Sequence, residues 1–294
     1  MTKKDVVTTG QIKKAVRDIK ALRPAYEGIL AFYEKLFLAQ EASKKHIHLQ
    51  PIKIPEDLLS VKRKEKFPLI ARKDFTVDIK ASEALLKKIC RLAGEANEVL
   101  THAGVKLMDA LDRGTVDAPT LLSKTLSEDD IYFDETAKNL GIDKEVLLFM
   151  AHGSIRPSLS LCAEQLATYI DKDTLWEKGY CPVCGSPPAI SILRGEGERF
   201  LFCSFCDHEW LSQRIYCPFC ENKDQKTLHY FFSEEEEEYR VDVCDKCKRY
   251  IKTVDTREIK RPVYSFLEQV ATLHLDIIAQ NQGLQSGHPL WLQT

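Results

Sequence analysis

Cysteine pairs of the form CxxC are the residues of this chain whose spacing most clearly supports chemistry. Eight of the ten cysteines form four such pairs: Cys181/Cys184, Cys203/Cys206, Cys217/Cys220 and Cys244/Cys247. Two cysteines three residues apart can turn both sulfurs toward one ion, and a second pair that returns on a β-hairpin completes a tetrahedral shell. Two such units in tandem predict two metal sites, each with four cysteine ligands.

The residues between the pairs indicate which pairs share a site. In the first unit an apolar run at 189–193 and a returning strand at 199–202 flank a Gly-Glu turn. In the second unit strands at 227–232 and 239–243 flank an acidic tip of five consecutive glutamates. Each unit is typical of one hairpin that ends at a cysteine pair. We therefore expect the first pair to share a site with the second, and the third with the fourth; a crossed pairing would need interlaced hairpins.

Four thiolates in a tetrahedral shell select zinc or iron, and the sequence is compatible with both. A closed shell leaves no open coordination position, so zinc here would be structural. Iron in the same shell can gain and lose one electron, which keeps electron transfer as an alternative. We favour the structural role, in which the ions stabilise small β units with thin cores. Nearby His208 could replace a sulfur ligand, but four sulfurs suffice at each site.

The chain as a whole is expected to be an α+β protein in four parts. Residues 1–170 show helical periodicity and form a predicted α-helical N-terminal domain, in which Cys90 and Cys162 pack as small apolar residues. Residues 171–213 and 214–258 are predicted to be the first and second metal-binding β ribbons, each with four cysteine ligands, and residues 259–294 a C-terminal helix and tail.

Local signals refine this division of the helical residues. Pro157 is expected to open a new helix, and Pro262 the last one, because proline suits the first helical turn. Asp134 and Asp143 are expected to be N-caps.

Two connecting segments carry weaker signals. The basic segment 56–78 is expected to be a solvated connection with one apolar anchor, Phe67-Pro68-Leu69-Ile70. Residues 207–216 are expected only to link the two ribbons.

Composition and charge limit the functional classes. The formal net charge is −2, and acidic residues outnumber basic ones between Cys181 and Lys260. Thiolates around divalent ions add negative charge there, so this region should repel nucleic acid and favour binding of another protein. No run approaches the roughly 20 apolar residues of a membrane span, and the N-terminus shows no secretory signal. We expect a cytoplasmic protein without membrane insertion.

Sequence signatures of catalysis are absent. The chain has no GxxxxGK[ST] phosphate loop, no GxSxG nucleophile elbow and no HExxH zinc motif. We therefore expect no enzyme and no catalytic residue.

The cysteine pairs and their flanks resemble the formate dehydrogenase accessory protein family, FdhE. The resemblance covers about residues 179–255. It rests on Cys181-Pro182-Val183-Cys184-Gly185-Ser186, Cys203 and Cys206 with Glu209-Trp210, Arg214, Cys217 and Cys220, and Cys244-Asp245-Lys246-Cys247 with Tyr250 and Lys252. None of the eight cysteines departs from the family pattern.

The resemblance implies an accessory, chaperone-like factor of the cytoplasm. Such a factor binds the catalytic subunit of a molybdenum- or tungsten-dependent formate dehydrogenase and supports its maturation or activity. It also implies two rubredoxin-like, iron-binding sites with the eight cysteines as ligands. Two alternatives stay open: a rubredoxin-like electron-transfer protein acting on the same client, and a nucleic-acid-binding zinc-ribbon protein.

Overall fold

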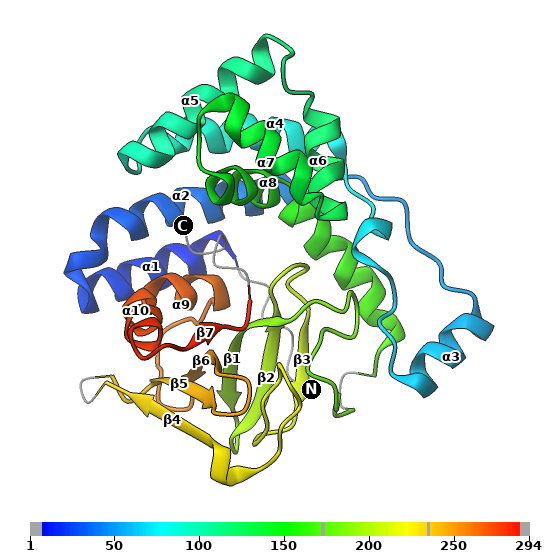
Figure 1. Cartoon of the computed structure of the whole chain (residues 1–294), viewed down its shortest axis with the longest axis vertical. Helices are drawn as coiled ribbons and strands as arrows, with labels where there is room; N and C mark the ends of the chain where they lie inside the picture. Colours follow the sequence, from blue (N-terminus) through cyan, green and yellow to red (C-terminus); the bar gives the residue numbers. More distant parts are fainter. Residues whose placement is uncertain (1–7, 172–173, 234–235, 289–294) are drawn as a thin grey trace. The chain divides into compact units, whose positions relative to one another are not determined.

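Two compact units make up the chain, and the structure, a computed structural model, describes residues 8–171, 174–233 and 236–288. The helical unit comprises the chain up to Gln50 together with Arg72–Leu161, and the sheet unit comprises Pro51–Ala71 together with the chain from Cys162 onward (Figure 1). The sheet unit thus includes the segment 51–71, which the sequence placed with the helices. The four-part division stays a prediction.

Amphipathic helices build the helical unit around buried apolar side chains such as Ile12, Leu36, Leu86 and Leu107. Their bounds are α1 Thr9–Leu22, η1 Pro24–Tyr26, α2 Glu27–Lys44, η2 Arg72–Asp74, α4 Ile79–Ala93, α5 Glu98–Asp112, α6 Ala118–Ser127, α7 Asp130–Leu140 and the greater part of α8 Lys144–Leu166. The α-helical character predicted for this half of the chain is confirmed.

One expected N-cap is confirmed and the other is wrong. Asp143 Oδ1 accepts the Glu145 N–H at 2.9 Å just before α8 begins. Asp134 instead lies within α7, because Asp129 already caps that helix by accepting the Tyr132 N–H at 3.0 Å. A side-chain oxygen can satisfy the free N–H groups only of the first turn.

Pro157 does not open a helix but lies inside α8. A proline inside a helix has no N–H to offer the carbonyl four residues earlier, and its ring crowds that carbonyl. The carbonyl belongs to Gly153, and Gln40 Nε2 of α2 donates to it at 2.8 Å. Gln40 Oε1 in turn accepts from Arg156 Nη1 at 3.2 Å. A side chain from another helix therefore replaces the bond that Pro157 removes, and α8 continues.

The segment Lys144–Tyr169, which adds η3 (Ala167–Tyr169) to α8, is long and apolar enough to cross a membrane by length and composition. The sequence predicted no such segment. Of its most apolar window, 89% is buried inside the protein, and buried core helices meet the same criteria of length and composition.

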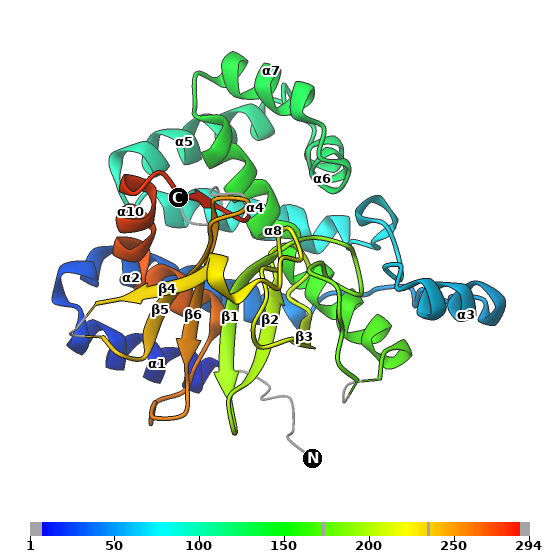
Figure 2. The same cartoon turned by 60° about the horizontal axis from the view of Figure 1, so that its bottom comes forward.

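The sheet unit joins both predicted ribbons in one sheet. Its strands are β1 Pro188–Arg194, β2 Glu198–Cys203, β3 Glu209–Ser212, β4 Leu228–Phe232, β5 Tyr239–Cys244, β6 Arg249–Asp255 and β7 Gln285–Ser286. The order is β3-β2-β1-β6-β5-β4, with β7 paired to β6, and Figure 2 shows β5, β6, β1, β2 and β3 in a row. The two hairpins β1–β2 and β4–β5 are as predicted. They meet through β6, which pairs parallel to β1 and antiparallel to β5.

Arg199 of β2 reinforces the junction between the two ribbons. Its side chain is 2% exposed, and its Nε donates to Ser191 Oγ of β1 at 2.9 Å. Its Nη1 donates to the Tyr216 carbonyl at 3.0 Å, and its Nη2 to Asp242 Oδ2 of β5 at 3.3 Å. One buried guanidinium thus bonds the first hairpin, the linking segment and the second hairpin, as its fork of five donors permits.

Helices cover one face of this sheet and complete its apolar core. They are α9 Ser265–Ala271 and α10 Leu273–Asn281; a further helix of the unit, α3, spans Glu56–Glu65, and a short turn, η4, spans Gln225–Thr227. Leu275 and Ala279 of α10 pack with Ile192 and Val241 of the sheet. Burial of this apolar stripe stabilises both the helix and the sheet.

The last helix is interrupted at Thr272, which the sequence did not predict. Lys252 of β6, 2% exposed at its side chain, donates to the carbonyls of Gln269 and Thr272 at 2.8 and 3.4 Å. It also pairs with Asp276 Oδ2 at 2.5 Å. A buried ammonium needs several acceptors, and the break between α9 and α10 frees backbone carbonyls for it.

The substitution Gln40→Met should lower the free energy of unfolding by about 1–3 kcal/mol, because the Gly153 carbonyl would lose its donor. Adding Pro157→Ala should recover part of that loss, since alanine restores an N–H four residues after Gly153. Urea unfolding of the two single variants and the double variant measures the coupling. Additive effects of the two substitutions would contradict this explanation of α8.

Candidate metal centres

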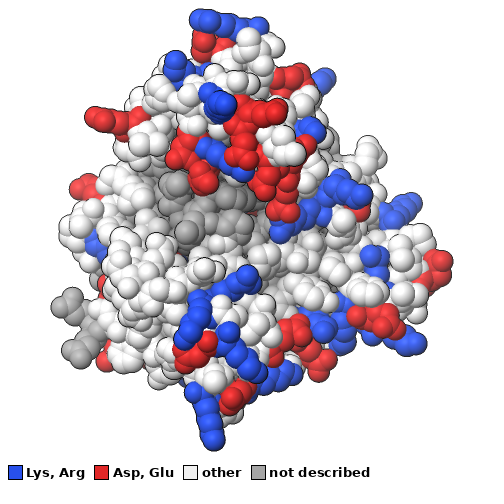
Figure 3. All heavy atoms as spheres, viewed as in Figure 1, with Lys and Arg blue, Asp and Glu red and all other residues white. Residues whose placement is uncertain are grey.

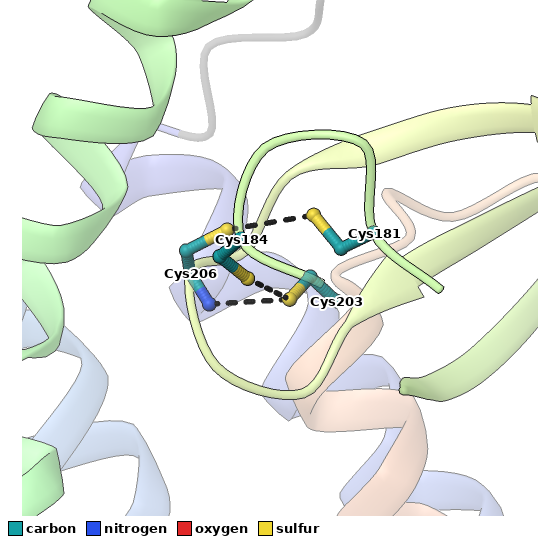
Figure 4. A group of neighbouring side chains, drawn as sticks. All are labelled: Cys181, Cys184, Cys203 and Cys206. Atoms are coloured by element: carbon teal, nitrogen blue, oxygen red, sulfur yellow. Dashed lines mark hydrogen bonds between the residues drawn. The ribbon is translucent and has the colours of Figure 1, made fainter. Parts of the chain in front are cut away.

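The first two cysteine pairs converge in the sheet unit. Cys181 and Cys184 lie on the turn before β1, and Cys203 and Cys206 lie at and after the end of β2. The Sγ atoms of Cys181 and Cys206 are 3.8 Å apart, and those of Cys184 and Cys203 are 3.4 Å apart (Figure 4). We call these four residues the first cluster.

The last two pairs form the second cluster in the same way. Cys217 and Cys220 lie on the turn before β4, and Cys244 and Cys247 at and after the end of β5. The Sγ atoms of Cys217 and Cys247 are 3.6 Å apart, as are those of Cys220 and Cys244. The predicted pairing of the first with the second and the third with the fourth CxxC is therefore confirmed.

Both clusters fit a tetrahedral metal ion. Within each cluster all four sulfurs lie within 4.8 Å of one another. A metal–sulfur bond of about 2.3 Å in a regular tetrahedron separates the sulfurs by about 3.8 Å, close to the separations found here. Each cluster could hold one zinc or iron ion, and the assignment of the eight cysteines as ligands stays a prediction.

The backbone shapes each CxxC as a tight turn. The residue after each second cysteine has a positive φ: Gly185 (76°), Asp207 (64°), Glu221 (55°) and Lys248 (56°). At three of these turns its N–H donates to the carbonyl of the first cysteine, at 2.8 Å from Gly185 and Lys248 and 2.9 Å from Glu221. This left-handed residue reverses the chain so that both cysteines of the pair face one point.

Sulfur atoms of both clusters accept hydrogen bonds that favour the thiolate. The N–H groups of Phe205 and Cys206 donate to Cys203 Sγ at 3.3 and 3.4 Å. Asn222 Nδ2 donates to Cys244 Sγ at 3.6 Å. The Cys184 sulfur also lies 3.1 Å from the Ser186 hydroxyl oxygen. Donors around the sulfurs stabilise negative charge, as a metal–thiolate site requires.

Protonation of the first cluster opposes metal binding at low pH. Burial raises the pKa of the Cys181 and Cys206 thiols well above the usual range. Burial also opposes ionisation of Cys184, but hydrogen bonds from Cys181, Cys203 and Cys206 hold its pKa well below the usual range. Since a metal binds the thiolate, loading this cluster must displace protons, and its metal affinity should fall as the pH falls.

The second cluster likewise combines one thiol of lowered pKa with thiols of raised pKa. Burial raises the pKa of Cys217 and of Cys247. Burial also disfavours the Cys244 thiolate, but hydrogen bonds from the Cys247 backbone and the Asn222 side chain lower the pKa of Cys244 to about 7. One ligand of this cluster is therefore close to ionisation at neutral pH.

The first cluster is enclosed by the segment 51–71. The N–H groups of Leu69 and Ile70 donate to the carbonyls of Pro182 and Val183, between the two cysteines of the first turn, at 2.9 and 3.0 Å. Leu69 and Ile70 are buried, whereas Phe67 is exposed. The expected apolar anchor thus consists of Leu69 and Ile70. All four cysteines of this cluster are buried.

The second cluster is open on one side. Cys217 and Cys244 are buried, but Cys247 is only partly buried and Cys220 is exposed. The two clusters have the same ligands and the same turns, yet they differ in access from solvent.

Histidines stay outside both clusters. His208 is buried beside the first cluster, where its carbonyl accepts the Cys203 N–H at 2.9 Å. His229 Nδ1 lies 3.3 Å from Asp245 Oδ2 on the exposed side of β4. Among the residues that the structure describes, the groups able to hold a metal consist of cysteines alone.

Sequence reasoning missed the residues that support the clusters. Ser186, Asn222 and the Leu69–Ile70 segment belong to them through the contacts above. Ser186 and Asn222 each stand two residues after a second cysteine, so their spacing was a usable signal. Leu69 and Ile70 lie more than a hundred residues before the first pair, and no local pattern connects them to it.

The substitution Gly185→Ala should destabilise the metal-loaded protein by about 1–2 kcal/mol, because alanine at positive φ is strained. The added Cβ would also stand 3.0 Å from Pro68 Cγ. The matched change Lys248→Gly should be neutral or stabilising, since it relieves the same strain at the last turn. Urea unfolding compares the two, and equal destabilisation by both would contradict the argument.

The second cluster should lose its metal first. In protein loaded with two zinc ions, excess 4-(2-pyridylazo)resorcinol should remove one ion about tenfold faster than the other, because solvent reaches Cys220. Mass spectrometry after brief alkylation should then find the label on the second cluster: Cys217, Cys220, Cys244 and Cys247. The variant Cys220→Ser should lack the fast phase and keep the slow one. A single phase, or earlier labelling of Cys181 and Cys184, would refute the proposed difference.

Comparison with known proteins finds relatives of the part of the chain that holds the cysteine clusters. Residues 180–214 match the family model "FdhE, central domain", and residues 215–292 match "FdhE, C-terminal domain". A "Protein FdhE homolog" of Aquifex aeolicus is 37% identical over 147 residues, 49% of this chain and 50% of that protein. "Protein FdhE" of Escherichia coli is 33% identical over 134 residues, 43% of this chain and 42% of that protein. The matches thus span half or less of these curated relatives.

A solved structure shares the fold over nearly the whole chain. The crystal structure of the FdhE protein from Pseudomonas aeruginosa superposes with a TM-score of 0.71 and covers 98% of this chain and 97% of that one. The sequence identity is 21%, so this likeness speaks for the fold. Over residues 180–292, which hold both cysteine clusters, the chain is therefore similar in sequence to FdhE proteins.

Proposed function

We propose that this protein is an accessory, chaperone-like factor that binds the catalytic subunit of a molybdenum- or tungsten-dependent formate dehydrogenase in the cytoplasm and supports its maturation or activity. The observation that carries the proposal is the FdhE family match across the sheet unit, including both cysteine clusters. In this role the two ions, zinc or iron, stabilise the surface that binds the client, and the protein itself catalyses no reaction.

The construction of the sheet unit supports a binding role for the metals. Each hairpin begins and ends at one cluster, so a bound ion closes the hairpin at its base. Loss of the ion would leave several buried sulfurs without their counter-charge and would open the hairpin. The surface of this unit therefore depends on its metal content.

A second candidate function rests on the open side of the second cluster. If the ion there is iron, exposure of Cys220 gives a redox partner access to a one-electron centre. A reversible change in visible absorbance on reduction of anaerobically purified protein would support this reading. A colourless protein loaded with zinc would exclude it.

Nucleic-acid binding is the least favoured role. Figure 3 shows Lys and Arg interspersed with Asp and Glu on the face viewed, without one continuous basic area. Binding to a polyanion needs several clustered cations to displace its counterions. Retention on heparin that falls with salt would favour this role instead.

An anaerobic pull-down from the native host tests the main proposal. The tagged chain should capture a formate dehydrogenase catalytic subunit and carry about two metal ions per chain, as two four-cysteine sites require. The variant Cys217→Ser should lose one metal ion and should capture about tenfold less of the catalytic subunit. Lys246→Ala, a change on the CDKC turn that removes no ligand, should keep both. Full capture after complete loss of metal would show that the metals do not support binding, and absence of the enzyme from metal-loaded protein would refute the client.

A further inference from the structure

The sheet has one open edge among the residues that the structure describes. At one end of the strand order, β3 is covered, because the Trp176 N–H donates to the Leu211 carbonyl at 2.9 Å and Trp176 bridges to Ser212. The pairing of β6 with β1 begins only at Thr253. Near the start of β6, β7 pairs with Arg249 and Tyr250 instead, so this edge of β6 is also occupied. At the other end, β4 pairs with β5 on one side and has no strand on its other side (Figures 1 and 2).

Large aromatic side chains stand exposed on β4. Tyr230 is 55% exposed and Phe232 is 48% exposed. Their rings stack with centroids 6.2 Å apart, and the Arg240 guanidinium of β5 lies 4.8 Å from the Tyr230 ring centroid. Phe231, between them in the sequence, points to the opposite face and packs against the core. The exposed aromatic side chains are thus held in place by their contact with each other and by Arg240 of the neighbouring strand.

Edge strands in soluble proteins usually carry features that prevent pairing with another chain. Lysines, prolines, bulges or a covering segment serve this purpose. The sequence of β4, Leu228-His229-Tyr230-Phe231-Phe232, contains no lysine or proline, and its pairing with β5 runs without a bulge. The opposite edge, at β3, is covered by Trp176. The open edge at β4 is therefore best explained by a partner that pairs with it.

We propose that β4 binds an extended, basic segment of another polypeptide as an added strand. Backbone groups of the open edge supply the hydrogen bonds, and apolar side chains at alternate positions of the segment pack on Tyr230 and Phe232. In the sequence, an acidic run of five glutamates at positions 234–238 follows this strand after Ser233. Of those that the structure describes, Glu237 is exposed, whereas Glu236 pairs with His274 at 2.9 Å. Basic residues that follow the apolar part of the segment complement this charge.

A second copy of this chain fits the edge less well. Antiparallel pairing of two β4 strands would bring the end of β4 in one copy beside the residues just before β4 of the other. Those residues form η4, Gln225–Thr227, which is not extended and cannot continue the strand. The charges of Lys223, Asp224 and Lys226 sum to +1 and do not oppose this pairing, whereas the shape of η4 does. A separate extended segment meets no such restriction. Assigning that segment to formate dehydrogenase rests on the proposed function, whereas binding at β4 does not.

Fluorescence anisotropy with synthetic peptides tests the proposal on the full, metal-loaded chain. The probe is a short peptide that alternates valine and threonine and ends in lysines; in a matched peptide glutamates replace the lysines. At low salt the lysine peptide should bind at least about tenfold tighter, since its charge complements the acidic run. Two further peptides carry N-methyl groups on alternate backbone amides. In one peptide the methyl groups lie on the strand edge that would face β4, and in the other they lie on the opposite edge. Methylation of the edge that faces β4 should abolish binding, and methylation of the other edge should not.

Protein variants locate the binding to β4. Tyr230→Ser and Phe232→Ser should each weaken binding of the lysine peptide about tenfold or more, as loss of an aromatic contact does. Ile277→Ser is the matched control, because Ile277 is 60% exposed but lies on α10. Circular dichroism and metal content confirm that each variant is folded.

Three results would overturn the proposal. One is failure of the lysine peptide to bind, or equal binding of the lysine and glutamate peptides. Another is binding of both methylated peptides, which would exclude strand pairing. The third is a dimer in light scattering that Tyr230→Ser dissociates, which would assign the edge to a second copy of this chain. Failure of the pull-down to capture a formate dehydrogenase subunit would refute the proposed function, but it would not affect these peptide results.

Discussion

Four sulfur atoms converge within 4.8 Å at each of two points in the sheet unit, and a cation bound there would stabilise this convergence. Burial alone disfavours the thiolates, as the raised pKa values of Cys181 and Cys206 show. A metal ion reverses that penalty and joins the two ends of a hairpin. The left-handed residue after each CxxC follows from the same need, because both cysteines must face one ion.

A metal ion at each cluster would close one hairpin, but it would not join the two hairpins to each other. That junction comes from the parallel pairing of β1 with β6 and from Arg199, whose guanidinium bonds to Ser191, Tyr216 and Asp242. Loss of any one of these hydrogen bonds would leave a buried guanidinium N–H without an acceptor and would lower the stability of the fold. The two ribbons are local structures, and their union in one sheet is a tertiary effect.

The same distinction explains what the sequence could predict. The hairpins and the pairing of the CxxC motifs follow from residues close together in the chain, and both are confirmed. Strand β3, where the sequence predicted only a link, pairs with β2 close by in the chain. The interruption at Thr272 and the continuation of α8 through Pro157 depend on partners far away, Lys252 and Gln40. Local propensity at these positions is weak or points to another structure, and distant hydrogen bonds decide the outcome. Leu69 and Ile70 were noted only as an apolar anchor, since their bonds to the first cluster cross more than a hundred residues.

The two clusters also differ in what their surroundings allow them to do. The first is enclosed by the segment 51–71 and suits a permanent structural ion. The second is open at Cys220, and its Cys244 pairs in the sheet with Leu228, the first residue of β4. A metal ion at the second cluster therefore fixes the start of the strand whose far side is the open edge. Binding of a segment at β4 and metal loading of the second cluster should accordingly be coupled, because each orders the same two strands.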